Sequence, residues 1–185
     1  MVAWTSLIWL LACASARGPD PAPDMAALVR LARQAVVAEV GGKTPPHPAT
    51  STPARPVFVT IEKKGRILGC RGSLETRTPS LESEVVEAAR AAAKHDPRYS
   101  PLKRADLDGF LVTVTVVERR DPVETVAGLR PEDGLVLTSG GRTGVVLPWE
   151  GKDPEVRLTW AYRKAGVKQG AQVRLYRLIA ERCRG

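Results

Sequence analysis

Residues 67–72 read Ile67-Leu68-Gly69-Cys70-Arg71-Gly72, with two glycines flanking a cysteine at the end of a strand-like run. Glycines inside a strand let another backbone or a ligand approach closely, because no side chain stands in the way. Just upstream, residues 57–61 alternate apolar side chains, and residues 63–66 read Lys-Lys-Gly-Arg. We therefore expect a β-hairpin that carries the cysteine motif on its second arm, and we expect any chemistry of the protein to lie there.

The rest of the chain predicts helices and strands in blocks rather than in strict alternation. Helices are expected from Met25 to Val40 after the capping residue Asp24, from Thr78-Pro79 onward, and over residues 154–165. Strands are expected over residues 109–117 and 173–180, and in a second hairpin around the glycine turn at 139–142. Residues 121–124 are expected to interrupt the first of these, and residues 181–184 to form a basic end. This order is typical of an α+β fold with a mostly antiparallel sheet and flanking helices.

The chain is basic, with 185 residues and a formal charge of +8 and a pI near 9.8. Such a charge favours association with anions but says nothing about the fold. Only 5% of the residues are aromatic, too few for evident base-stacking surfaces, so we do not expect nucleic-acid binding. The arginines nearest the C-terminus are candidates for a basic face toward an anionic ligand or a protein partner: Arg174, Arg177, Arg182 and Arg184.

Residues 1–16 contain no charged side chain and resemble an export signal, with Ala14-Ser15-Ala16 as a small-residue cleavage site. Leu10-Leu11-Ala12-Cys13 resembles a bacterial lipoprotein box instead, in which Cys13 would carry the lipid. Both interpretations predict an exported protein, periplasmic or secreted, that is attached to a membrane only through its signal or its lipid. A linker over residues 17–24 and one domain over residues 25–185 complete the expected organisation.

Two thiols, Cys70 and Cys183, remain once the signal is set aside. An oxidising compartment would allow them to form a disulfide, and the sequence leaves this open. There is no Cys-x-x-Cys pair, so neither a zinc site nor a redox motif is suggested. We expect neither a metal nor a cofactor.

Five segments, taken in order, resemble the AMMECR domain family, which is named for the Alport syndrome, midface hypoplasia and elliptocytosis chromosomal region. They are Gly-Cys-Arg-Gly-Ser-Leu-Glu at 69–75, Asp-Pro-Arg-Tyr-Ser-Pro-Leu at 96–102, Val-Thr-Val-Thr-Val-Val at 112–117, Asp-Gly-Leu-Val-Leu at 133–137 and Arg-Lys-Ala-Gly-Val at 163–167. The resemblance covers roughly residues 25–182. It implies a two-lobed α+β protein of unsettled biochemical activity, whose cysteine motif lines a functional cleft; with its signal, this chain would be an exported member of bacterial type.

One departure from the family pattern concerns an arginine. The family motif reads Leu-Arg-Gly-Cys-Ile-Gly, so Leu68 here stands where the family has arginine, and Arg71 stands where it has isoleucine. Because side chains alternate along a strand, an arginine moved by three positions is expected on the opposite face of the sheet.

Two functions follow as hypotheses. In the favoured one, the protein is a non-catalytic binding or accessory module outside the cytoplasm, with Gly69, Arg71 and Gly72 at its binding site. Asp96 and Arg98 could join this site, although the alternative is a structural role in which they fasten the loop after the second helix.

In the alternative, the protein is a cysteine-dependent enzyme. Cys70 would be the nucleophile, with its pKa lowered by Arg71, and His95 would act as the base. The amides of Gly69 and Gly72 would then stabilise a developing negative charge.

Overall fold

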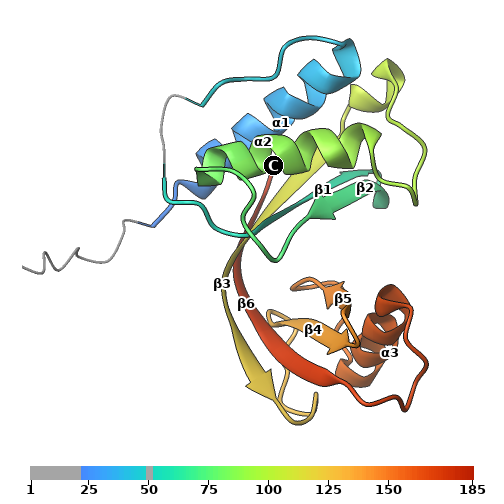
Figure 1. Ribbon diagram of the computed structural model, residues 1–185. Helices are drawn as coiled ribbons and strands as arrows, with labels where there is room; N and C mark the ends of the chain where they lie inside the picture. The colour runs from blue at the N-terminus through green and yellow to red at the C-terminus, as the bar shows by residue number, and fades with distance from the viewer. Residues whose placement is uncertain (1–21, 49–51) are drawn as a thin grey trace, which may run out of the picture.

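The computed structural model describes residues 22–48 and 52–185, and it consists of two lobes joined by two long strands (Figure 1). Six strands form one antiparallel sheet in the order β2-β1-β3-β6-β4-β5. The structure therefore confirms the predicted α+β class. The predicted signal over residues 1–16, the lipidation candidate Cys13 and most of the linker over residues 17–24 lie outside the described residues.

The first lobe packs two helices on one face of a hairpin. Its elements are α1 (Met25–Gly41), β1 (Val57–Lys63), β2 (Arg66–Gly72), α2 (Leu81–Lys94) and the short 3-10 helix η1 (Arg104–Leu107). The side chain of Asp24 caps α1 by accepting a hydrogen bond from the amide of Ala27 at 2.9 Å, as the sequence predicted. Val59 of β1, buried under α1 and α2, belongs to the largest core cluster.

The second lobe repeats this arrangement on a smaller scale, with one helix against a hairpin. Its elements are β4 (Gly134–Ser139), β5 (Arg142–Val146) and α3 (Pro154–Ala165). Asp153 caps α3 through the amides of Glu155 and Val156, and Gly166 ends the helix in the left-handed conformation. Leu135, Leu137 and Ala161 are fully buried in the core of this lobe.

Strands β3 (Leu111–Val123) and β6 (Arg174–Arg184) run through both lobes and hold them together (Figure 1). Both strands are longer than predicted. The sequence placed an interruption at residues 121–124, yet Pro122 lies in β3 opposite Tyr176. Beyond Val116, β3 pairs only with β6, so its other side is an open edge of the sheet. Proline is tolerated there, because its missing N–H can face that open edge, where no neighbouring strand needs a donor. Likewise β6 continues to Arg184, because residues 181–184 pair with the start of β3.

Helix α2 begins two residues later than predicted, with Ser80 as its cap and Pro79 outside the helix. The reason is that Thr78 is already engaged in the preceding loop, where its amide donates to a carboxylate oxygen of Glu84 at 2.6 Å. Glu82 fixes another loop in the same way, by accepting hydrogen bonds from the amide and hydroxyl of Thr52. These buried acids fasten loops to the helix, which agrees with a structural rather than a catalytic role.

A glycine in each lobe allows a strand to lie directly against a helix. A Cβ atom at Gly69 of β2 would overlap the carbonyl group of Ala92 in α2. A Cβ atom at Gly144 of β5 would overlap the carbonyl group of Ala161 in α3 in the same way. The close backbone approach expected at the cysteine motif is therefore present, and it brings β2 against α2.

Candidate functional site

A cleft of about 690 Å³ lies between the two lobes. One wall comes from β1, β2 and the loop after α2, and the other comes from β5, the loop after it and the end of α3. The residues that line it are Phe58, Cys70, Arg71, Gly72, Arg98, Tyr99, Thr143, Val145, Leu147, Glu150, Arg163 and Lys164. The cleft therefore contains most of the predicted motif together with residues from the other lobe.

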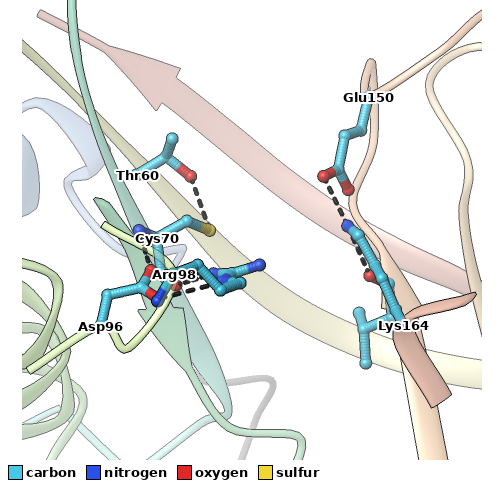
Figure 2. A network of polar contacts seen from close by, with 7 residues as sticks. Thr60, Cys70, Asp96, Arg98, Glu150 and Lys164 are labelled. Atoms are coloured by element: carbon cyan, nitrogen blue, oxygen red, sulfur yellow. Dashed lines mark hydrogen bonds and ion pairs between the residues drawn. The ribbon is translucent and has the colours of Figure 1, made fainter. Parts of the chain in front are cut away.

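Cys70 points from β2 into this cleft. Its Sγ accepts a hydrogen bond from the hydroxyl of Thr60, its partner on β1, at 3.1 Å (Figure 2). Burial raises the pKa of the Cys70 thiol, and the nearby carboxylate of Glu150 acts in the same direction. The hydrogen bond from Thr60 and the charges of Arg98 and Lys164 oppose this rise without cancelling it. Cys70 is therefore a neutral thiol at neutral pH, and Arg71 does not activate it as the enzyme hypothesis expected.

Asp96 and Arg98 fasten the loop after α2 to the backbone of Cys70 (Figure 2). The Cys70 amide donates to Asp96 Oδ2 at 2.8 Å, and Arg98 donates to the Cys70 carbonyl at 2.6 Å. Arg98 also donates to both carboxylate oxygens of Asp96, at 2.9 and 2.8 Å. Burial of Asp96 opposes its charge, but these hydrogen bonds outweigh it and hold the pKa of Asp96 below its usual range.

The guanidinium of Arg98 remains available on its outer side. Its side chain is 51% exposed, whereas that of Asp96 is 1% exposed. Arg98 thus has two functions: it holds the cysteine motif in place and contributes a cation to the cleft.

His95 lies away from this cluster. Its Nε2 is 3.6 Å from a carboxylate oxygen of Glu39 on α1, and its side chain is 68% exposed. Helix α2 ends here, so His95 and Asp96 point in different directions although they are neighbours in the chain. The structure brings Asp96 and Arg98 to Cys70 and does not bring His95 there.

The prediction that Arg71 lies on the face of the sheet opposite to position 68 is wrong. The register of β1 and β2 shifts between Ile61 and Glu62, so that Leu68 is an extra residue in β2. Such a bulge reverses the alternation of side chains beyond it. Leu68 packs against the core under the helices, and Arg71 pairs with Val59, whose side chain belongs to that same core. Both positions therefore lie on the helix-covered face, and Arg71 reaches the cleft from the edge of the sheet.

The second lobe contributes charged residues to the cleft that the sequence did not identify. Arg163 and Lys164 lie in the last turn of α3, and Glu150 lies in the loop after β5. Lys164 Nζ is 2.5 Å from Glu150 Oε1 and donates to the carbonyl of Val145 at 2.9 Å (Figure 2). Residues 163–167 form one of the segments that resemble the family, but two cations near a helix C-terminus are common for electrostatic reasons. Arg163 and Lys164 were therefore not predicted as site residues.

The arginines near the C-terminus do not form one basic face. Arg177 pairs with Asp121 at 3.2 Å, and Arg184 pairs with Glu62. Arg174 lies beside the glycine turn of the second lobe, whereas Arg182 lines a smaller compartment next to the cleft. The cleft itself is lined by four other cationic side chains, Arg71, Arg98, Arg163 and Lys164.

Cys70 and Cys183 are both free thiols. Strands β1 and β3 lie between their strands. Cys183 packs toward the helix-covered core, whereas Cys70 packs toward the other face. The disulfide that the sequence allowed is therefore not formed.

Within residues 22–48 and 52–185, no group of three or more His, Cys, Asp or Glu side chains is arranged to hold a metal ion. None of the helices in this part of the chain is long and apolar enough to cross a membrane.

Comparisons with known proteins agree with this architecture. A family model described as AMMECR1 matches residues 29–183. A protein from Aeropyrum pernix is 37% identical over 186 residues, covering 83% of this chain and 76% of that protein. A protein from Thermofilum pendens is 33% identical over 193 residues, covering 86% of this chain and 89% of that protein.

A solved structure is also similar. The crystal structure of the uncharacterized protein PH0010 from Pyrococcus horikoshii superposes with a TM-score of 0.70 at 29% identity, covering 85% of this chain and 89% of that one. The match of the family model over residues 29–183 places this protein in the AMMECR1 family.

Proposed function

We propose that the protein is a non-catalytic binding or accessory module that holds a small anionic ligand in the cleft between its two lobes. The observation that carries this proposal is the charge of the cleft lining. Four cationic side chains line it, and two carboxylates neutralise two of them, since Arg98 pairs with Asp96 and Lys164 pairs with Glu150. Four minus two leaves two uncompensated positive charges, on Arg71 and Arg163.

The geometry supports an anion at this point for two reasons. Arg71 and Arg163 have no ion-pair partner in the described part of the chain, and they come from different lobes. Arginine presents several N–H donors in a planar fork, which suits carboxylate and phosphate groups. A small anion between the lobes would relieve the repulsion among these cations and would tie the lobes together.

The same cleft supports binding better than catalysis. The Cys70 thiol is kept neutral by burial, and the histidine that could act as its base is paired with Glu39 instead. A nucleophilic cysteine needs a lowered pKa or an adjacent base.

Calorimetric titration with inorganic phosphate tests the proposal, with Arg163→Glu as the diagnostic variant and Arg66→Glu as its control. Arg66 is exposed on β2 outside the cleft, so both variants change the net charge by the same amount. We expect Arg163→Glu to weaken phosphate binding by about tenfold or more, equivalent to about 1.4 kcal/mol, and Arg66→Glu to leave it nearly unchanged. Equal weakening by both variants, or no binding to the wild type, would reject the proposal.

The cysteine-dependent enzyme remains the second candidate, because Cys70 does line the cleft. An enzyme of this kind needs a Cys70 that iodoacetamide alkylates at neutral pH much faster than a free cysteine. Alkylation at or below the rate of a free cysteine would exclude it.

We further propose that the protein is exported, on the basis of the apolar residues 1–16 and their small-residue cleavage site. The intact mass of the mature protein tests this. Cleavage after Ala16 would support secretion, and lipid on Cys13 would support a lipoprotein. A mass that retains the unmodified residues 1–16 would reject both.

A further inference from the structure

A smaller compartment of about 240 Å³ continues from the cationic cleft, and the two share Cys70, Leu147 and Glu150. Its floor is the cleft-facing side of β1 and β3, and its outer wall is the loop after β5. The residues that line it are Thr60, Glu62, Gly65, Ile67, Cys70, Thr113, Thr115, Leu147, Pro148, Trp149, Glu150 and Arg182. Its chemistry differs from that of the main cleft, because hydroxyl groups and an indole replace most of the cations.

The floor carries a row of threonines, one of which is unsatisfied. Thr60 and Thr113 are direct neighbours across β1 and β3, and Thr60 donates its hydroxyl to Cys70 Sγ. Thr113 is only 3% exposed, yet its Oγ1 has no hydrogen-bond partner. A buried hydroxyl without a partner costs about 1–3 kcal/mol, and such groups are rare in folded proteins. A ligand in this compartment would supply the missing partner.

The outer wall carries a large, exposed aromatic side chain in a strained backbone. Trp149 is 56% exposed and has a φ of 65°. Hydrogen bonds from its amide to the Pro131 carbonyl at 2.8 Å, and from the Glu150 amide to the Leu147 carbonyl at 3.1 Å, hold this turn. Left-handed backbone at a bulky residue persists only where its surroundings enforce it. The turn therefore keeps the indole of Trp149 beside the compartment. Hydrophobic burial does not explain this position, because the side chain is mostly exposed.

We propose that this compartment binds the planar ring of a ligand whose anionic group lies in the cationic cleft, and that the ligand is of the nucleoside monophosphate class. The ring would stack against Trp149, and its polar edge would meet the hydroxyl of Thr113 and the guanidinium of Arg182, which has no ion-pair partner in the described residues. A volume of 240 Å³ lies below the roughly 300–1,000 Å³ of sites for drug-sized ligands, so the compartment suits one ring system. This inference rests on the anion site proposed above.

The test is a titration of the full-length protein with adenosine 5′-monophosphate and cytidine 5′-monophosphate, compared with inorganic phosphate and with adenosine. We expect a monophosphate to bind more tightly than phosphate or adenosine and to quench tryptophan fluorescence. Trp149→Ala should weaken the monophosphate by about tenfold through lost stacking and should leave inorganic phosphate unchanged. Thr113→Val, which keeps the size and branching of the side chain, should weaken the monophosphate by about fivefold.

With Thr113→Val, weaker ligand binding cannot be attributed to misfolding. It removes an unsatisfied hydroxyl, so it should not lower the stability of the unliganded protein. Phosphate binding at least as tight as monophosphate binding, with Trp149→Ala and Thr113→Val unchanged, would overturn this inference and leave the anion site intact. Absence of binding by both phosphate and the monophosphates would overturn both proposals.

Discussion

The amide of Cys70 donates to Asp96 Oδ2 at 2.8 Å, and this hydrogen bond helps to tie the cysteine motif of β2 to the loop after α2. Arg98 completes the arrangement by bonding both to Asp96 and to the Cys70 carbonyl. The position of the thiol, and of one cation of the cleft, thus depends on a carboxylate that is almost fully buried.

Asp96→Asn should destabilise the protein by about 2 kcal/mol at pH 7, because hydrogen bonds to a charged group are worth about 1.5–3 kcal/mol. The folded-state pKa of Asp96 is lowered, so its contribution is present above the unfolded pKa and is lost as the pH falls through the folded pKa. The difference between wild type and variant should therefore shrink in acid. Urea unfolding at several pH values measures this.

The control for this prediction is Asp108→Asn, because Asp108 is exposed and has no hydrogen-bond or ion-pair partner in the described residues. It should change the stability by less than about 0.5 kcal/mol at every pH. A destabilisation by Asp96→Asn that stays constant into acid would show that the charge of Asp96 does not stabilise the fold.

Gly69→Ala should destabilise the first lobe by about 3 kcal/mol or prevent folding, because the added methyl group would overlap the carbonyl of Ala92 in α2. Gly128→Ala is the matched control, since no atom lies within 4 Å of its added Cβ and its φ is not positive. Thermal unfolding followed by circular dichroism separates the two. Equal melting temperatures for the two variants would mean that β2 and α2 are not in close contact.

Cys70 should react with iodoacetamide more slowly than a free cysteine at pH 8. Its pKa is raised, so a smaller fraction of the thiol is in the reactive thiolate form at a given pH. Thr60→Val removes the hydrogen bond to Sγ and should slow the reaction further. Thr115→Val, on the same sheet face but without a bond to the thiol, should not.

Peptide mapping by mass spectrometry measures this reaction at Cys70 separately from the other thiols. The rate should continue to rise with pH beyond the range where an ordinary thiol has titrated. A rate that reaches a plateau near neutral pH would instead show that Cys70 is already a thiolate there, and this would support the enzyme hypothesis.

Much of the fold followed from local patterns in the sequence. Asp24 caps α1 where predicted, α3 spans the predicted residues 154–165, and the two glycine-containing hairpins are present. The errors arose where pairing partners far apart in the chain decide the outcome. Pro122 stays in a strand because only β6 lies beside it at that point. The bulge at Leu68 puts Arg71 on the same face of the sheet as Leu68, where strict alternation would put it on the other face.

The site was predictable in part for the same reason. Cys70, Asp96 and Arg98 belong to segments that carried the family resemblance, and they do meet. Arg163 belongs to such a segment too, but it and Glu150 reach the cleft only because the long strands β3 and β6 place the second lobe opposite the first. No local spacing in the sequence indicates that two lobes face each other in this way. Nor does any local pattern indicate that His95 pairs with Glu39.

The most direct test of the anion site is the location of tungstate, a phosphate-shaped anion, by anomalous scattering from crystals of the protein soaked in it. We expect tungstate in the cleft between the lobes, in contact with Arg163 of α3 and with Arg98 or Arg71 from the opposite wall. Tungstate bound only outside the cleft, for example at Arg174, with the cleft empty, would contradict the proposed anion site.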